Sequence, residues 1–306
     1  MLTLQLQEKY SMFFLRLIAK LPFSVLYAVS DFLFFFSYYV VRYRRSLVRK
    51  NLIASFPEKT RSEISLIQRE YYHNLCDYIV ETLKLLNIEK ADLAKRVVFK
   101  NVQILEKYKS QDQPVLLLTS HQFNWEWLLT SGNLSLPVAI DYVYQPINNN
   151  TVNRFLLTCR TRFGAHPIKR NELAREIVKR KNVLRGVAIV ADQYPGKKRD
   201  KKYLTTFLHQ ETAFFYGTNQ LAALTQYPIL YAETRKIKRG YYEVTLVELA
   251  EPPYAKNSDE IIERYVKAAE KVIREYPSGW LWSHNRWKKR HPTQASGRYH
   301  PGSTVS

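Results

Sequence analysis

Residues 114–126 read Pro-Val-Leu-Leu-Leu-Thr-Ser-His-Gln-Phe-Asn-Trp-Glu, an apolar run that leads directly into polar and aromatic residues. The run at 115–119 is bounded by a proline and a serine, which is typical of a buried β-strand. The residues from Trp125 onward have the pattern of a helix, and Ser120 is available as its cap. The sequence therefore predicts a strand that turns into a helix, with His121 in the connection.

His121 and Glu126 are the candidate catalytic residues of this connection, with four residues between them. Backbone N–H groups and the positive end of a helix dipole at such a junction favour a neutral ring, as a general base requires. On a regular helix the two side chains would diverge by about 140°, so pairing requires His121 in the loop and Glu126 in the first turn. Glu126 would then accept from one ring nitrogen and leave the other to take a proton from a hydroxyl. Taken alone, the motif equally fits a helix cap followed by an ordinary acid.

Strand and helix patterns alternate along most of the chain. Strands are predicted at 115–119, 138–145, 187–191, 229–234 and 242–248, and helices at 60–86, 124–132, 151–163, 171–182, 213–226 and 258–275. Thr60-Arg61-Ser62-Glu63 has the form of a capping box, so the segment at 60–86 should form one or two amphipathic helices. The alternation predicts an α/β fold with a mostly parallel central sheet flanked by helices.

The N-terminal part is a hydrophobic helical segment. Leu21–Val41 contains a single charge, Asp31, and is long enough to cross the hydrocarbon core of a membrane. A signal peptide fits poorly, because the run is long and basic residues follow it. A membrane span, a pair of interfacial helices and a hairpin packed on a soluble core remain open. We expect a membrane anchor at 1–50, a catalytic domain at 51–290 and a polar, disordered tail at 291–306.

The charge balance indicates an anionic partner. The 306 residues include 47 Lys and Arg against 27 Asp and Glu, a net charge of +20. Nucleic acid, a phospholipid surface or an anionic substrate would each fit this imbalance. The cluster Arg42-Tyr43-Arg44-Arg45 favours the cytoplasmic side of a membrane. The two cysteines, Cys76 and Cys159, provide neither a disulfide framework nor a Cys-x2-Cys zinc site.

The order of several motifs resembles the bacterial lipid A late (lauroyl/myristoyl) acyltransferase family, within the lysophospholipid acyltransferase superfamily. The resemblance spans roughly residues 10–290. It rests on Asn51–Glu58, Ser120-His121-x4-Glu126, Tyr144-Gln145-Pro146, Arg160–Gly164 with Ile168–Arg170, Ala191-Asp192-Gln193 and Trp282–Lys288. A single motif would be weak evidence, whereas the ordered set is specific.

The resemblance implies roles for particular residues. His121 would be the general base and Glu126 its orienting carboxylate, while Arg160 and Asp192 stand at positions essential in the family. The substrate would be bound by Arg160, Arg162, Lys169, Arg170, Asp192, Gln193 and Arg286, and the basic residues among them would contact its anionic groups. The chain departs from the family at Gln145, where an arginine is usual, and at 207–210, which replace a Phe-Phe-Gly run of the pocket wall.

The implied reaction moves a fatty acyl group from an acyl carrier protein thioester, or acyl-CoA, to a hydroxyl of a lipid A precursor. The resemblance places it at the cytoplasmic face of the bacterial inner membrane, with an anionic lipid acceptor and without a metal, a redox cofactor or nucleic acid. Two alternatives remain open. One is an acyltransferase for another acceptor, such as an amino-acid lipid or a glycolipid, and the other is a basic nucleic-acid- or membrane-binding protein without catalysis.

Overall fold

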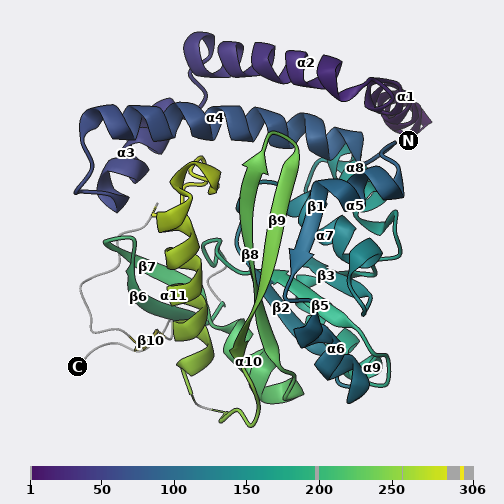
Figure 1. Ribbon diagram of the computed structural model, residues 1–306, viewed down its shortest axis with the longest axis vertical. Helices are drawn as coiled ribbons and strands as arrows, with labels where there is room; N and C mark the ends of the chain where they lie inside the picture. The colour runs from purple at the N-terminus through teal and green to yellow at the C-terminus, as the bar shows by residue number, and fades with distance from the viewer. Residues whose placement is uncertain (1, 197–199, 257, 288–296, 300–306) are drawn as a thin grey trace.

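A seven-stranded sheet forms the centre of the protein (Figure 1). The structure is a computed structural model that describes residues 2–196, 200–256, 258–287 and 297–299. The strands, in spatial order, are β1 (Val97–Lys100), β9 (Tyr241–Ala250), β8 (Ile229–Lys238), β2 (Val115–Thr119), β5 (Gly186–Val190), β3 (Ile140–Tyr144) and β4 (Pro167–Lys169). All neighbouring pairs are parallel except β8 and β9. The predicted mostly parallel α/β fold is confirmed.

The strand β2 is buried along its whole length between β5 and β8. Successive side chains of a strand point to opposite faces of the sheet. Leu116 and Leu118 therefore join one hydrophobic core, and Val115 and Leu117 join the other. A strand that is covered on both faces reads as an unbroken apolar run, which is the pattern seen at 115–119.

Helices cover both faces of the sheet. The core that contains Leu117 includes residues of α5 (Lys90–Arg96), α6 (Gln103–Ser110), α7 (Trp125–Ser135) and α8 (Asn150–Thr161). The core that contains Leu116 includes residues of α9 (Leu173–Lys179), α10 (Gly217–Thr225) and α11 (Glu260–Glu275). Short 3-10 turns, η2 (Arg170–Glu172) and η3 (Pro277–Gly279), precede α9 and follow α11. The sheet therefore lies between two layers of helices.

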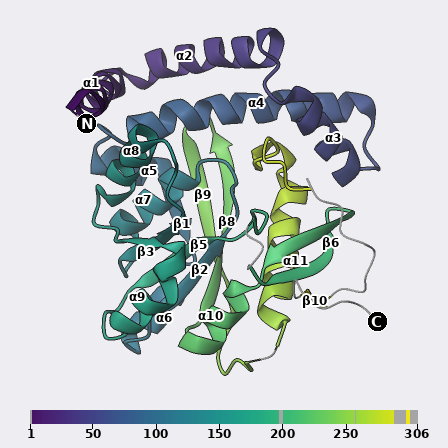
Figure 2. The ribbon, with the colours of Figure 1, turned by 180° about the vertical axis from the view of Figure 1, so that it is seen from behind.

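The segment predicted at 60–86 is one long helix, α4 (Arg61–Lys84), that lies across one end of the sheet (Figures 1 and 2). The predicted capping box is confirmed. The Thr60 side chain accepts from the backbone N–H of Glu63, and the Glu63 carboxylate accepts from the backbone N–H of Thr60. These two bonds satisfy backbone donors that the first turn of a helix leaves free.

The N-terminal helices α1 (Leu2–Ala19) and α2 (Phe23–Phe35) form an outer layer on the far side of α4 from the sheet (Figures 1 and 2). A π-helical turn, η1 (Phe36–Val40), continues α2, and α3 (Arg45–Ser55) then packs on α4. Lys84 of α4 donates to the carbonyls of Ala19 and Leu21 at the bend between α1 and α2. Phe23–Val40 is apolar and long enough to cross a membrane, with a mean hydropathy of 1.5, and only 22% of it is buried.

A second, small sheet contains β6 (Lys202–Phe207), β7 (Gln210–Phe215) and β10 (Gly297–Tyr299). The predicted helix at 213–226 is wrong over its first residues, because 213–215 belong to β7. The two-residue turn of the hairpin has positive φ at Leu208 (51°) and His209 (60°). Such turns usually carry Asn-Gly or Asp-Gly, so this hairpin has no recognisable turn signal. The predicted tail at 291–306 lies outside the described residues except for β10.

Candidate active site

The connection between β2 and α7 is hydrogen-bonded to residues 279–281, which are distant in the sequence. Gln122 forms an antiparallel bridge with Trp280. The Phe123 N–H donates to the Gly279 carbonyl at 2.7 Å, and the Leu281 N–H donates to the His121 carbonyl at 3.1 Å. The connection is thereby fixed on both sides of His121.

The helix α7 is capped by Asn124, so the predicted cap at Ser120 is wrong. The Asn124 side chain accepts from the Trp127 N–H at 3.0 Å. Ser120 lies farther back, with its hydroxyl 3.1 Å from that of Tyr231. A longer loop therefore places His121 before the helix and Glu126 in its first turn, as the pairing hypothesis required.

The carboxylate partner of His121 is nevertheless Asp192, and the predicted pairing with Glu126 is wrong. The His121 Nδ1 atom lies 2.5 Å from Asp192 Oδ1. The His121 backbone N–H also donates to Asp192 Oδ2 at 3.0 Å. Asp192 follows β5, the parallel neighbour of β2, so the two residues meet at the carboxyl edge of adjacent strands. Ligand sites of open α/β sheets lie at this edge.

Asp192 is fully buried and ionised. Burial opposes its charge, but the electrostatic effect of His121 and the hydrogen bonds from His121 and Trp280 outweigh burial and lower the pKa of Asp192 to about 2. The Trp280 Nε1–H donates to Asp192 Oδ2 at 2.7 Å. The sequence analysis did not predict this contact.

The contacts fix which ring nitrogen of His121 carries the hydrogen. An ionised carboxylate accepts hydrogen bonds only, so Nδ1 carries the hydrogen toward Asp192. Nε2 is then an acceptor, which agrees with the Gln193 amide nitrogen 3.2 Å away. The ring is thereby held in the tautomer whose Nε2 lone pair faces Gln193 and could take a proton once a hydroxyl replaces that amide.

Glu126 pairs with Arg160 instead. The Arg160 Nε and Nη2 atoms donate to the two Glu126 oxygens at 2.7 and 2.6 Å, a bidentate geometry. The Trp125 indole also donates to Glu126 at 3.1 Å. Burial lowers the pKa of the Arg160 guanidinium, but Glu126 outweighs that effect and raises it. Two nitrogens of Arg160 are thus committed to Glu126, which leaves Nη1 for a substrate group.

A buried carboxylate behind α7 connects the site to the N-terminal layer. Glu81 of α4 accepts from Asn124 Nδ2 at 2.8 Å, from the Tyr242 hydroxyl at 2.7 Å and from the Tyr27 hydroxyl of α2 at 3.0 Å. Burial raises the pKa of Glu81 to about 7. The residue that caps α7 therefore shares one partner with α2.

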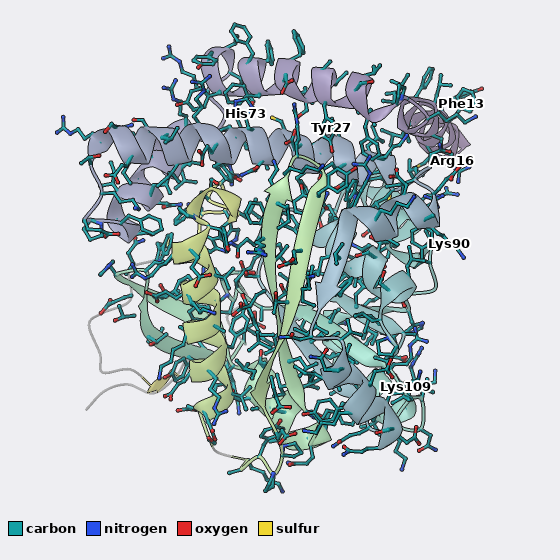
Figure 3. The ribbon with its side chains drawn as sticks, in the orientation of Figure 1. Phe13, Arg16, Tyr27, His73, Lys90 and Lys109 are labelled. Atoms are coloured by element: carbon teal, nitrogen blue, oxygen red, sulfur yellow. The ribbon has the colours of Figure 1, made fainter. Side chains whose placement is uncertain are left out.

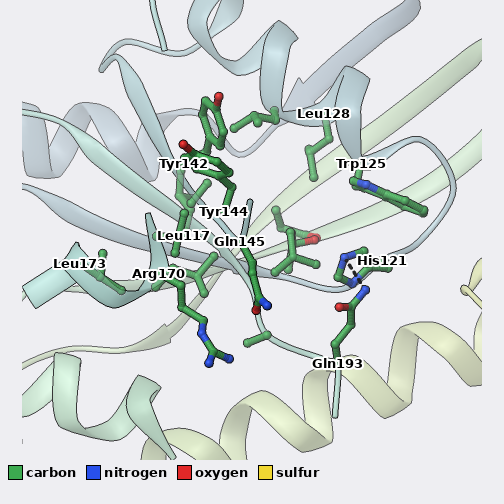
Figure 4. Close-up of a pocket in the computed structure, with 18 of the residues that line it drawn as sticks. Leu117, His121, Trp125, Leu128, Tyr142, Tyr144, Gln145, Arg170, Leu173 and Gln193 are labelled. Atoms are coloured by element: carbon green, nitrogen blue, oxygen red, sulfur yellow. Dashed lines mark hydrogen bonds between the residues drawn. The ribbon is translucent and has the colours of Figure 1, made fainter. Parts of the chain in front are cut away.

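A cavity of about 820 Å³ opens beside His121 (Figure 4). Exposed polar side chains, Gln145 and Gln193, lie at its mouth. Its interior is lined by buried apolar residues of the sheet and of α7, which are Leu117, Leu128, Ile140, Ala232 and Leu246. Figure 4 shows the Gln193 amide facing the His121 ring, with Leu117 and Leu128 on the cavity wall. The site joins a polar reacting centre to an apolar chamber.

The structure brings some of the other predicted site residues to this cavity. Arg160, Arg170 and Gln193 line it, and Arg170 also donates to Asp200 at 3.2 Å. Lys169 is exposed beside Glu172 and lies outside the lining. The segment at 207–210 also lies outside it, in the β6–β7 hairpin, so the predicted departure there does not alter the wall.

Arg162 and Arg286 lie outside the lining as well. Arg162 donates to the Leu85 carbonyl, and burial lowers its pKa. Arg286 is fully buried against the Phe214 ring, and none of its side-chain nitrogens has a hydrogen-bond partner among the described residues. Burial lowers the pKa of Arg286 to about 10. Within the same residues, no three His, Cys, Asp or Glu side chains are grouped as a metal site would require.

One family of known proteins and two individual relatives match most of the chain. A family described as bacterial lipid A biosynthesis acyltransferase matches residues 6–289. The chain is 26% identical over 257 residues to a lipid A biosynthesis palmitoleoyltransferase of Escherichia coli (strain K12), an alignment that covers 84% of this chain and 82% of the relative. It matches a lipid A biosynthesis acyltransferase of Shigella flexneri with the same identity and coverage.

Proposed function

Since this chain belongs to the bacterial lipid A biosynthesis acyltransferase family, we propose that it transfers a fatty acyl group from a thioester to a hydroxyl of a lipid A precursor, with His121 as general base. The observation that carries the proposal is the His121–Asp192 pair at the mouth of an apolar cavity of about 820 Å³. That volume lies within the range of roughly 300–1,000 Å³ found for small-molecule sites. The polar mouth would hold the reacting groups and the interior the acyl chain.

The unprotonated Nε2 of His121 would take the proton of the acceptor hydroxyl as its oxygen attacks the thioester carbonyl carbon. Asp192 would stabilise the imidazolium that forms, without itself taking the proton. Collapse of the tetrahedral intermediate breaks the carbon–sulfur bond, and the imidazolium returns the proton to the departing thiolate. The hydroxyl attacks directly, so neither Cys76 nor Cys159, both buried, is required.

The oxyanion of the tetrahedral intermediate needs a hydrogen-bond donor. We assign Gln193 to this role, because its amide nitrogen lies 3.2 Å from His121 Nε2. An acceptor hydroxyl that bonds to Nε2 would displace this amide, which could then donate to the carbonyl oxygen of the thioester beside it. The remaining Nη1 of Arg160, on the same cavity, would serve the acyl carbonyl or an anionic group of the acceptor. Removing one oxyanion donor typically costs about 2.7–4 kcal/mol in the barrier.

The donor would be an acyl carrier protein thioester, whose acidic surface suits a basic rim, or acyl-CoA. Arg170 on the cavity and Lys169 beside it provide positive charge near the mouth. The acceptor would be an anionic lipid reached from the cytoplasmic face of the bacterial inner membrane, where the N-terminal helices would meet the bilayer.

The test is transfer of labelled acyl groups from acyl carrier protein to a lipid A precursor in detergent. His121→Ala should lower transfer at least about 100-fold, the usual contribution of a general base. His166→Ala is the matched control, because His166 lies outside the cavity lining. Equal activity of the wild type and His121→Ala would remove His121 from the mechanism. Wild-type transfer only to another lipid would overturn the proposed acceptor and keep the reaction.

A further inference from the structure

The N-terminal helices carry exposed apolar side chains along one side. On α2 and η1 these are Val25, Val29, Phe32, Phe36 and Val40, each three or four residues apart and therefore on one helix face. On α1, Phe13, Phe14 and Leu17 are exposed in the same way. Phe32 is 65% exposed, a large value for a phenylalanine. We call this surface the apolar face.

The opposite side of α2 is fixed to the protein by polar bonds along its length. The Tyr27 hydroxyl donates to Glu81 at 3.0 Å, and the Ser30 hydroxyl donates to Asp77 at 2.8 Å. Asp31, the only charge of Leu21–Val41, pairs with Arg239 at 2.7 Å. The single charge of the hydrophobic stretch is thus neutralised by the catalytic domain. Figure 3 shows Tyr27 and His73 between α2 and α4, and Phe13 on α1 at the outer edge.

These bonds determine how the segment can meet a membrane. A crossing helix would draw α4 into the hydrocarbon with it, since the two helices lie side by side (Figures 1 and 2). The exposed Arg69 and Glu70 of α4 would then lose water, which is strongly unfavourable. We propose that α1, α2 and η1 lie flat in one leaflet, with the apolar face toward the acyl chains, and do not span the bilayer.

The charges around the apolar face identify the lipid surface as anionic. Arg16 and Lys20 are exposed at the end of α1, and Arg42 is exposed just after η1. Asp31 is the only acid between residues 10 and 44, and it is paired. An apolar face bordered by basic residues alone is the pattern of an interfacial helix on anionic lipids.

The arrangement also brings the bilayer to the catalytic site. α1 packs on α8, the helix that carries Arg160. Ile147, which lines the cavity, and Val152 near the start of α8 are exposed apolar residues. This part of the inference rests on the proposed function: a lipid acceptor would enter the cavity from the leaflet in which α1 lies.

A helix that lies flat and a helix that spans the bilayer place the N-terminus on different sides of the membrane relative to the catalytic domain. A cysteine introduced by Thr3→Cys should react with a membrane-impermeant thiol reagent in inside-out vesicles and not in spheroplasts. Lys109→Cys, on the exposed far end of the catalytic domain (Figure 3), is the matched control. Both native cysteines are buried and can remain. Labelling of the two positions from opposite sides would overturn the proposal, because a span places the N-terminus across the bilayer.

Vesicle binding tests the lipid surface itself. Phe32→Asp with Phe36→Asp should weaken cosedimentation with vesicles of phosphatidylglycerol and phosphatidylethanolamine by roughly tenfold or more. Val178→Asp with Leu224→Asp, at 56% and 55% exposure elsewhere, is the matched control and should bind as the wild type does. Equal vesicle binding by the two double variants, with unchanged thermal transitions, would refute the proposal. A concentration-dependent dimer that Phe32→Asp with Phe36→Asp disrupts would also refute it, because the apolar face would then bind a second copy of the chain. His121→Ala should bind vesicles normally, so a failure of the proposed function would be seen separately.

Discussion

Replacing Asp192 by asparagine tests the reassigned partner of His121. The pKa of Asp192 is lowered from 3.8 to about 2, and the electrostatic effect of His121 contributes to that shift. The lowered pKa corresponds to about 2–3 kcal/mol at 1.36 kcal/mol per pKa unit. Burial acts in the opposite direction, so the favourable interactions together exceed this figure.

The expected loss of activity follows from that free energy. If the stabilisation is lost in the transition state, Asp192→Asn should lower kcat by roughly 60-fold or more. An asparagine amide can also donate to Nδ1 and select the wrong tautomer of His121. The loss would then approach about 10⁴-fold, the value for that substitution in a His–carboxylate pair. KM should change little, because Asp192 is buried behind the ring.

The assay is single-turnover transfer from labelled acyl carrier protein, with thermal unfolding measured on each variant. Glu126→Gln provides the comparison, since the Glu126 carboxylate accepts from Arg160 and Trp125. The reasoning would be refuted if the kcat of Asp192→Asn stays within about threefold of the wild type while Glu126→Gln loses activity without losing stability. It would return the orienting role to Glu126.

Three further results are expected. Glu126→Gln leaves the Arg160 charge, which is only 18% exposed, without its carboxylate and should destabilise the protein by about 3–5 kcal/mol. Glu126→Gln with Arg160→Met should recover stability but not transfer. An unchanged Tm of the single variant would contradict this. A Cβ at Gly132 would lie 3.4 Å from Ile140 and 3.5 Å from Leu136, so Gly132→Ala should fit, whereas Gly132→Leu should shorten the preferred acyl chain. Each displaced methylene costs about 0.8 kcal/mol, roughly a fourfold change in relative kcat/KM. An unaltered donor preference would exclude the cavity as the acyl site. The pKa of Glu81 is raised from 4.5 to about 7 in the folded protein. Its contribution to stability is therefore complete at a pH below the pKa of the unfolded state and is lost as pH rises through about 7. Glu81→Gln should flatten the fall of Tm between about pH 5 and 8, and an identical slope in the variant would show that another group titrates.

Local patterns were sufficient to predict five strands of the central sheet and the position of His121, but not the short edge strands β1 and β4. The run at 115–119 and the capping box at Thr60 each carry their signal within a few residues, and the structure confirms both. The β6–β7 hairpin was missed because Leu208 and His209 take positive φ without the usual turn residues. Propensity at 213–215 then resembled the start of a helix.

The partner of His121 depends on strand order, which single-sequence patterns do not contain. Glu126 is near in sequence, whereas Asp192 is 71 residues away and becomes adjacent only because β5 pairs with β2. A signal was available. Both residues follow predicted strands by one or two positions, and parallel neighbours bring such residues together. The contact from Trp280 is 88 residues from Asp192 and had no comparable signal.

The bonds between α2 and α4 bear on how a soluble form of this enzyme could be engineered. Deleting the first 44 residues would leave Lys84 without the carbonyls of Ala19 and Leu21, and Asp77 without Ser30. Glu81 would lose the Tyr27 hydroxyl while still holding the Asn124 cap of α7. Buried polar groups stripped of their partners are costly. The N-terminal segment is therefore an integral wall of the catalytic domain, and solubility is better sought by polar substitutions on its outer side than by truncation.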